Sequence, residues 1–171
     1  DGYRKLVQSF VDLAMTKQPE NLEELISLQY DEKLSVEEKI IEQVGVIGEK
    51  LELSKYAILR AEKVVPYNHP GNQLATLVGL NSNTSEAEEA GRQVAMQVAA
   101  MNPVAVDKNG IDQATIDKEL EVGKDLAIQE GKPAELADKI AFGRLNKFFK
   151  ENTLLSQQFV RDDKQTVEKF L

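Results

Sequence analysis

The only histidine of the chain is the first residue whose type could do chemistry, and it stands in the segment Tyr67-Asn68-His69-Pro70-Gly71. A histidine in a turn can act as a general base, as a metal ligand or as a contact to a partner. The chain has no cysteine and no second histidine, so a metal site here would need carboxylates. The nearest acid before the turn is Glu62, and none follows until Glu86. The residues alone leave catalysis, an ordinary surface role and a partner contact open, and the surroundings favour catalysis least.

The glycine-containing motifs do not form a nucleotide or cofactor site. The segment Gly45-Val46-Ile47-Gly48 lacks the third glycine and the strand-to-helix setting of a dinucleotide loop. No Gly-Lys-Ser/Thr phosphate loop occurs, and Gly131-Lys132-Pro133 is better explained as a turn between helices. Acidic runs, such as the one in residues 86–89, fall opposite apolar helix faces and are typical of a solvated surface. We therefore predict that the protein is not an enzyme and has no catalytic residues, metal or cofactor.

The composition indicates a mostly helical protein of one domain or two small ones. Its 171 residues suffice for a buried core, and the lack of cysteine fits a reducing compartment. A net charge of −8 repels phosphate backbones and anionic lipid, so we expect no direct nucleic-acid contact and no membrane contact. No apolar run approaches the roughly 20 residues that span a bilayer. The start Asp1-Gly2-Tyr3-Arg4 is no signal peptide, and we expect a cytoplasmic protein in a processed or excised form.

Two strands are expected to hold the histidine turn in place. Residues 63–69 and 72–80 read as strands joined by a tight turn, and Pro66 fits a sheet edge or a bulge because it has no N–H to donate. Alternate residues of the second strand share one face: Leu74, Thr76, Val78 and Leu80. Residues 51–61, just before this pair, also read as a strand, although their alternation is imperfect.

Helices account for most of the remaining chain. Apolar residues at helical spacing predict helices over residues 3–14, 21–28, 36–47 and 85–101, and a last short helix over residues 166–171. Ser35 with Glu38, and Ser85 with Glu88, have the spacing of a capping box. Gly48 fits a helix stop.

Two helices of nearly equal length are predicted over residues 112–130 and 133–150. The turn between them is so short that they must fold back on each other as an antiparallel hairpin. Each apolar stripe is narrow, as in a two-helix coiled coil that projects from a body. Such an arm suits docking or dimerisation. A structural self-association module, giving a homodimer, is therefore one hypothesis for this protein.

Several segments together resemble the elongation factor Ts family. These are residues 125–133 (DLAIQEGKP), 140–145 (IAFGRL), 154–159 (LLSQQF), 94–100 (VAMQVAA), 46–49 (VIGE) and 67–71 (YNHPG). They occur in family order over nearly the whole chain. The resemblance implies a helix-dominated α+β fold: small antiparallel sheets backed by helices, with a protruding antiparallel helical hairpin. The first core half would span residues 1–62, the second residues 63–111 and 151–171, and the coiled-coil insertion residues 112–150.

The resemblance also implies a function, that of a guanine nucleotide exchange factor for the translational GTPase elongation factor Tu. Carried over by position, Ile47 and Gly48 should contact the nucleotide-binding domain of the GTPase. So should His69, from the turn formed with Tyr67, Pro70 and Gly71. A histidine is common in the family where this chain has Gln97. The family pattern has a Thr-Asp-Phe motif just before the position of Asp1 and a strand after that of Leu171. Because this sequence lacks the phenylalanine motif, we expect it to bind weakly and to exchange nucleotide poorly.

Overall fold

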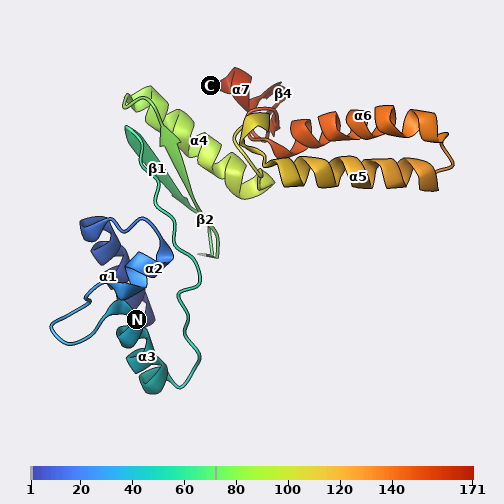
Figure 1. Cartoon of the computed structure of the whole chain (residues 1–171). Helices are drawn as coiled ribbons and strands as arrows, with labels where there is room; N and C mark the ends of the chain where they lie inside the picture. The colour runs from blue at the N-terminus through green and yellow to red at the C-terminus, as the bar shows by residue number, and fades with distance from the viewer. Residues whose placement is uncertain (1, 72) are drawn as a thin grey trace. The chain divides into compact units, whose positions relative to one another are not determined.

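The computed structural model describes residues 2–71 and 73–171, and the chain divides into two compact units, residues 1–59 and 60–171. Figure 1 shows helices as the dominant element, with short paired strands. The predicted α+β, helix-dominated fold class is confirmed. Asp1 and Asn72, which the sequence analysis placed in the first core half and in the second strand, lie outside the described residues.

The first unit contains helices α1 (Gly2–Lys17), α2 (Leu22–Ser27) and α3 (Val36–Ile47). Leu6 and Phe10 of α1 and Val36 of α3 form its buried core. The Phe10 ring also packs edge-on against Tyr30, with 5.6 Å between ring centroids. The amphipathic pattern of α1 is therefore satisfied by the start of α3 and the loop before it.

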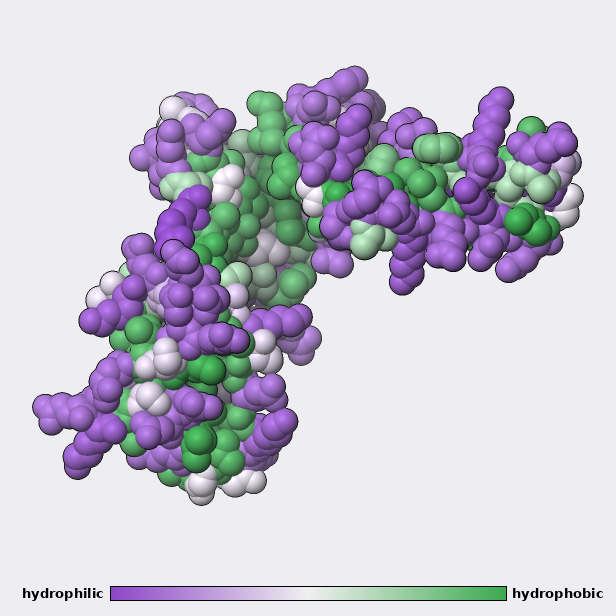
Figure 2. Space-filling model, in the orientation of Figure 1, coloured by the Kyte–Doolittle hydropathy of each residue, from purple (hydrophilic) through white to green (hydrophobic). Residues whose placement is uncertain are grey.

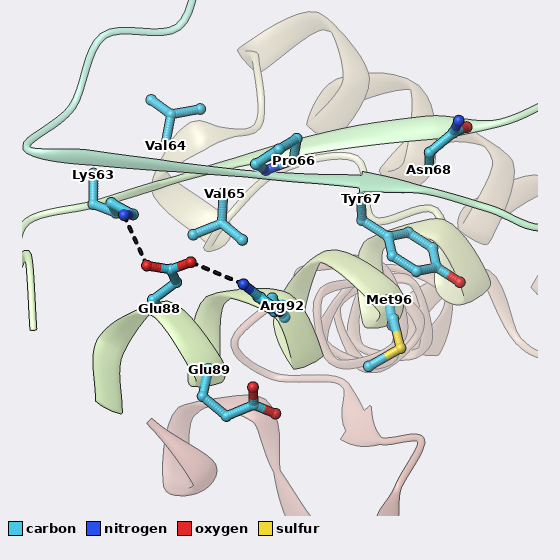
Figure 3. Close-up of a pocket in the computed structure, with 10 residues that line it drawn as sticks. All are labelled: Lys63, Val64, Val65, Pro66, Tyr67, Asn68, Glu88, Glu89, Arg92 and Met96. Atoms are coloured by element: carbon cyan, nitrogen blue, oxygen red, sulfur yellow. Dashed lines mark hydrogen bonds and ion pairs between the residues drawn. The ribbon is translucent and has the colours of Figure 1, made fainter. Parts of the chain in front are cut away.

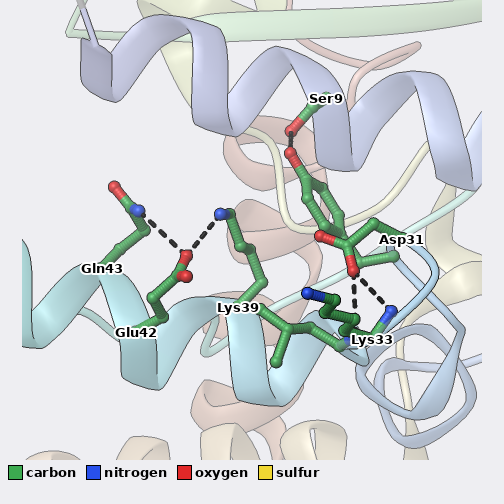
Figure 4. A network of polar contacts seen from close by, with 8 residues as sticks. Ser9, Asp31, Lys33, Lys39, Glu42 and Gln43 are labelled. Atoms are coloured by element: carbon green, nitrogen blue, oxygen red, sulfur yellow. Dashed lines mark hydrogen bonds and ion pairs between the residues drawn. The ribbon is translucent and has the colours of Figure 1, made fainter.

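The loop between α2 and α3 is ordered by polar contacts around Asp31 (Figure 4). The Asp31 carboxylate accepts hydrogen bonds from the backbone N–H groups of Lys33 and Leu34, which lower its pKa from the ordinary value of 3.8. Lys39 lies 5.5 Å from the centroid of the Tyr30 ring and pairs with Glu42. These contacts fix the start of α3 against α1.

The capping signals predicted in the first unit, at Ser35 and at Gly48, are confirmed, and Asn21 provides a further cap. Asn21 caps α2 by accepting a hydrogen bond from the Glu24 N–H, and Ser35 and Glu38 form the predicted capping box. Gly48 ends α3 in the left-handed conformation, with φ of 77°, a backbone angle that side chains with a Cβ adopt rarely.

The prediction of a strand over residues 51–61 is wrong. The structure describes all of these residues and shows no strand among them. Leu51 and Leu53 pack against the first core, and the Tyr56 hydroxyl donates a hydrogen bond to the Pro19 carbonyl oxygen at 3.0 Å. Within described residues 2–59, backbone bridging of the sheet kind is limited to Gln29 and Ser35. This segment has no neighbouring strand among the described residues, and the side-chain contacts of Leu51, Leu53 and Tyr56 hold it instead.

The second unit begins with the predicted pair of strands. Strands β1 (Lys63–Asn68) and β2 (Ala75–Leu80) are antiparallel and in register from Lys63 opposite Leu80 to Asn68 opposite Ala75. Helix α4 (Ser85–Met101) packs on one face of the pair, where Val65 is buried. Its Gly91 permits this approach, because a Cβ built there would lie 2.9 Å from both Leu80 Cδ1 and Val65 Cγ2.

The second predicted capping box is wrong by one residue. Thr84, not Ser85, caps α4 by accepting a hydrogen bond from the Ala87 N–H. Glu88 is therefore free of a capping role and pairs with Lys63 of β1 at 2.8 Å and Arg92 of α4 at 2.9 Å. Adjacent hydroxyl residues made the start of the helix ambiguous in the sequence.

The predicted helical hairpin is present as α5 (Gln113–Gln129), capped by Asp112, and α6 (Ala134–Asn152). Small residues line the seam between the two helices: Gly123, Ala127, Ala137 and Ala141 are all buried. A Cβ built on Gly123 would lie 3.1 Å from the Ala141 Cα, so the backbones are almost in contact. In Figure 2, apolar patches interrupt the mainly polar surface of these helices.

The chain then returns from the hairpin to the core of the second unit. Before the hairpin there is a short 3-10 helix, η1 (Lys108–Gly110), and after it come β3 (Gln158–Phe159), β4 (Asp162–Thr166) and α7 (Val167–Phe170). The antiparallel β3–β4 pair was not predicted. A buried cluster joins α4 to these elements: Val94, Leu154, Phe159 and Val167.

Candidate functional site

The histidine turn is an extension of the β1–β2 hairpin. The His69 N–H donates a hydrogen bond to the Leu74 carbonyl oxygen at 2.9 Å, which continues the ladder one step beyond the strands. Pro70 and Gly71 follow at the exposed tip, where Gly71 has a φ of 95°. A proline and a left-handed glycine suit a tight reversal, because one has a fixed φ and the other tolerates a positive φ.

Tyr67 and His69 are brought together by the strand. Alternate residues of a strand point to one face, so these two side chains lie side by side. The Tyr67 hydroxyl and His69 Nδ1 are 2.9 Å apart, and the rings meet edge to face with 5.9 Å between centroids. His69 is exposed, whereas Tyr67 is half-buried. The exposed imidazole thus lies against a tyrosine ring that is itself partly buried in the fold.

An open groove of about 610 Å³ runs between β1 and α4 beside this turn (Figure 3). Tyr67 and Val65 point from β1 toward α4, and Tyr67 lies over Met96, whereas Pro66 points to the other side. Glu88 lies at the far end of the groove, between Lys63 and Arg92. Two cations hold the pKa of Glu88 below its ordinary value of 4.5: the Lys63 ammonium has the larger effect and the Arg92 guanidinium the smaller.

The second pair of predicted contact residues lies in the first unit, at the end of α3. Ile47 is the last residue of the helix and 41 % exposed, and Gly48 caps it by donating its N–H to the Val44 carbonyl oxygen at 2.9 Å. Val46 and Ile41 are also exposed. This helix end presents apolar side chains together with an accessible backbone turn, a combination suited to a protein contact.

The described parts of the chain hold no group of three or more His, Cys, Asp or Glu side chains placed to bind a metal ion. Among the helices that the structure describes, none combines the length and the apolar composition of a membrane span. The structure brings Tyr67 and His69 together, and their contact holds the imidazole in a defined position on the surface. Among the described residues, the side-chain contact of the His69 ring is with Tyr67.

Comparison with known proteins decides the family. The family model described as Elongation factor TS matches residues 1–171. The chain belongs to the elongation factor Ts family. Proteins named Elongation factor Ts from Amoebophilus asiaticus and Christiangramia forsetii are 48 % and 45 % identical to it, in each case over 100 % of this chain. The chain spans 62 % and 61 % of the lengths of these two relatives.

In this member of the family, the position where the resemblance suggested a histidine lies in a buried polar junction. Gln97 Nε2 donates to Gln157 Oε1 at 3.2 Å and to the Gln158 carbonyl oxygen at 3.1 Å, and the Val160 N–H donates to Gln97 Oε1 at 2.8 Å. Gln157 in turn donates to the carbonyl oxygens of Met101 and Glu151. The junction fastens α4, which backs the histidine hairpin, to the segment that follows α6.

Sequence reasoning missed this junction, although a signal for it existed. Gln97 stands three residues after Val94 and one before Val98, on the apolar side of α4. A polar side chain on a buried helix face requires partners, because an unpaired amide in the core is costly. The sequence shows that such partners are needed but not which residues supply them.

Proposed function

We propose that this chain binds the GTPase elongation factor Tu and promotes release of GDP during translation elongation. Membership of the elongation factor Ts family over all 171 residues is the observation that carries the proposal. The exposed His69 turn supports it, because the β1–β2 ladder and Tyr67 hold the histidine at a fixed place on the surface. On this proposal the chain is a binding protein and transforms no substrate of its own.

The partner contacts fall on two presented segments. Ile47 and Gly48 offer an exposed helix end in the first unit, and the turn of Tyr67, His69, Pro70 and Gly71 offers a rigid tip in the second. Both engage the nucleotide-binding domain of the GTPase. A net charge of −8 disfavours RNA and anionic membranes as alternative partners.

Exchange requires only that the chain bind one state of the GTPase better than another. If it prefers the nucleotide-free state by some factor, then by linkage its binding weakens GDP binding by the same factor. Neither a covalent step nor a metal ligand from this chain is needed. The factor by which the chain weakens GDP binding therefore equals the ratio of its affinities for the nucleotide-free and GDP-bound forms.

The experiment is a pair of titrations of this chain into elongation factor Tu, one nucleotide-free and one loaded with GDP. We expect measurable binding to the nucleotide-free form and at least about tenfold weaker binding to the GDP form, a difference of about 1.4 kcal/mol. Equal affinity for the two forms, or preference for the GDP form, contradicts the proposal. A complete elongation factor Ts from a relative provides the reference for tight binding.

A second candidate function, self-association through the helical hairpin, is favoured by one observation. Several large apolar side chains of α5 and α6 are at least 38 % exposed: Val122, Leu126, Ile128, Leu136 and Phe142. Monomeric proteins expose single apolar residues freely, but a series along one arm suits an interface. A homodimer built on this arm is compatible with GTPase binding by the histidine turn.

Sedimentation velocity over a wide concentration range tests the second candidate. A dimer held by the hairpin should dissociate on dilution, and Phe142→Ser should shift it toward monomer. Val160→Ser is the matched control, because Val160 is an exposed apolar residue outside the hairpin. A monomer at every concentration, or equal effects of the two substitutions, rules the hairpin dimer out.

A further inference from the structure

The contact between Tyr67 and His69 determines more than the position of the histidine. Because the Tyr67 hydroxyl lies 2.9 Å from His69 Nδ1, this nitrogen is already engaged within the chain. The other ring nitrogen, Nε2, is the atom left to face a partner from the exposed turn. The question is whether Nε2 offers a proton or a lone pair.

A neutral imidazole carries one proton, and the bond made by one nitrogen fixes the role of the other. A phenol hydroxyl is a good donor, whereas the lone pair of an unprotonated imidazole nitrogen is a good acceptor. The favoured arrangement therefore has the Tyr67 O–H donating to Nδ1, which puts the imidazole proton on Nε2. If the ring gains a second proton, Nδ1–H donates to the tyrosine oxygen and Nε2 still carries its proton. The outward nitrogen is a donor in both states.

We propose that Tyr67 is a positioning residue that makes His69 a fixed hydrogen-bond donor toward the partner. The recognised group on the partner is then an acceptor, a carbonyl or carboxylate oxygen. This inference rests on the proposed function and specifies the chemistry of its contact. Tyr67 can act in this way because its own ring is anchored: it is half-buried on β1 and lies over Met96 in the groove (Figure 3).

The support that Tyr67 gives is separate from the fold of the hairpin. The backbone bond from the His69 N–H to the Leu74 carbonyl oxygen, and the bond from Thr76 Oγ1 to the Ala95 carbonyl oxygen, do not involve the Tyr67 hydroxyl. Tyr67→Phe removes only that hydroxyl and keeps the ring edge against the imidazole. The substitution therefore isolates the proton placement from the packing.

The first test is the imidazole ¹⁵N spectrum of the chain alone. Because the chain has one histidine, the spectrum contains one pair of ring nitrogens and needs no assignment among several. At a pH where the ring is neutral, we expect a single Nε2–H tautomer in the natural sequence and a mixture of tautomers in Tyr67→Phe. A proton on Nδ1, or identical spectra for the two proteins, overturns the inference. This readout does not depend on GTPase binding.

The second test measures binding to nucleotide-free elongation factor Tu in a double-mutant cycle. Tyr67→Phe should weaken binding about fivefold, the usual worth of one hydrogen bond, when His69 is present. It should have no effect in a His69→Ala background, because Tyr67 acts only through His69. An equal loss in both backgrounds shows a merely structural role and overturns the inference.

The direction of the bond is tested by two side chains of nearly equal size at position 69. His69→Gln keeps an N–H donor and should retain more binding than His69→Glu, which offers only acceptor oxygens when ionised. Equal binding by the two variants contradicts a donor role. If the chain fails to bind the GTPase at all, the proposed function fails, and the ¹⁵N spectrum still decides the role of Tyr67.

Discussion

Gln97 of α4 and Gln157, sixty positions later in the chain, are joined by a hydrogen bond of 3.2 Å between two side chains that are 0 % and 1 % exposed. The bond links the helix behind the histidine hairpin to the segment that returns from α6. Within the described residues, every buried polar side-chain atom has a partner. The second unit therefore owes the relative placement of turn and hairpin arm partly to a polar junction.

Replacing Gln97 with methionine should lower the free energy of unfolding by about 2–3 kcal/mol, because the buried Gln157 Oε1 and the part-buried Val160 N–H and Gln158 carbonyl oxygen lose their partner. Methionine has a similar length, so little of the loss comes from packing. Denaturant unfolding measures it. Gln93→Met is the control one turn earlier on α4, where the Gln93 side chain makes an exposed hydrogen bond to Glu89. It should change stability by less than about 0.5 kcal/mol. Equal losses of stability for Gln97→Met and Gln93→Met would contradict the stabilising role assigned to the Gln97 hydrogen bonds.

Adding one methyl group at Gly123, in the seam between α5 and α6, is predicted to destabilise the protein. Gly123→Ala should destabilise the protein by about 1–2 kcal/mol, because the new Cβ lies 3.1 Å from the Ala141 Cα and the helices must separate. The gain in helix propensity, up to about 1 kcal/mol, offsets only part of this.

Gly143→Ala is the matched control for the seam. A Cβ at this exposed position of α6 meets nothing within 4 Å, so alanine should stabilise the protein by about 0.5–1 kcal/mol. Thermal unfolding of both variants gives opposite shifts of the midpoint if the seam is packed as described. Stabilisation by both substitutions would contradict the close approach at Gly123.

The ion pairs of Glu88 predict a pH dependence. Lys63 and then Arg92 lower the pKa of Glu88 below 4.5, so the charged carboxylate stabilises the folded protein above its unfolded pKa. This contribution is lost as the pH falls through the folded pKa. Glu88→Gln should be less stable than the natural sequence near pH 7, and the difference should shrink in acid as the pH falls below 4.5.

Denaturant unfolding near pH 7 and in acid, each at low and high salt, measures the stability difference and checks this prediction. Salt should reduce the difference at neutral pH, because these side chains are partly exposed. The control is Glu89→Gln, whose carboxylate accepts a hydrogen bond from Gln93 instead of pairing with a lysine and an arginine. A stability difference for Glu88→Gln that persists unchanged in acid would show that its effect is not electrostatic.

Local signals in the sequence predicted the parts of the fold that depend on neighbouring residues. The Ser35–Glu38 capping box, the Gly48 helix stop and the α5–α6 hairpin are all set by residues within a few positions of one another. The prediction of a strand over residues 51–61 was wrong because a strand needs a neighbouring strand to pair with its backbone N–H and C=O groups, and the local sequence does not show whether one is present. Strand β4, with sequence DDKQT, was missed because its polar residues show no apolar alternation.

The candidate site likewise contains features set by nearby residues, which could be predicted, and features set by tertiary packing, which could not. The turn at His69 could be predicted from Pro70, Gly71 and the flanking strands, because the hairpin is local. The bond from Tyr67 to His69 follows from strand alternation but was not anticipated. Gln97 could not be paired with Gln157 in advance, because tertiary packing alone brings these positions together.

The rate of fluorescent GDP release from elongation factor Tu at increasing concentrations of this chain tests the central claim most directly. The account predicts a rate that rises with concentration, and a curve displaced to about tenfold higher concentration for His69→Ala, equal to about 1.4 kcal/mol of lost binding. Asn83→Ala, in the exposed loop after β2 at the other end of the same hairpin, should leave the curve unchanged. A flat response, or superimposable curves for His69→Ala and the natural sequence, would contradict the account.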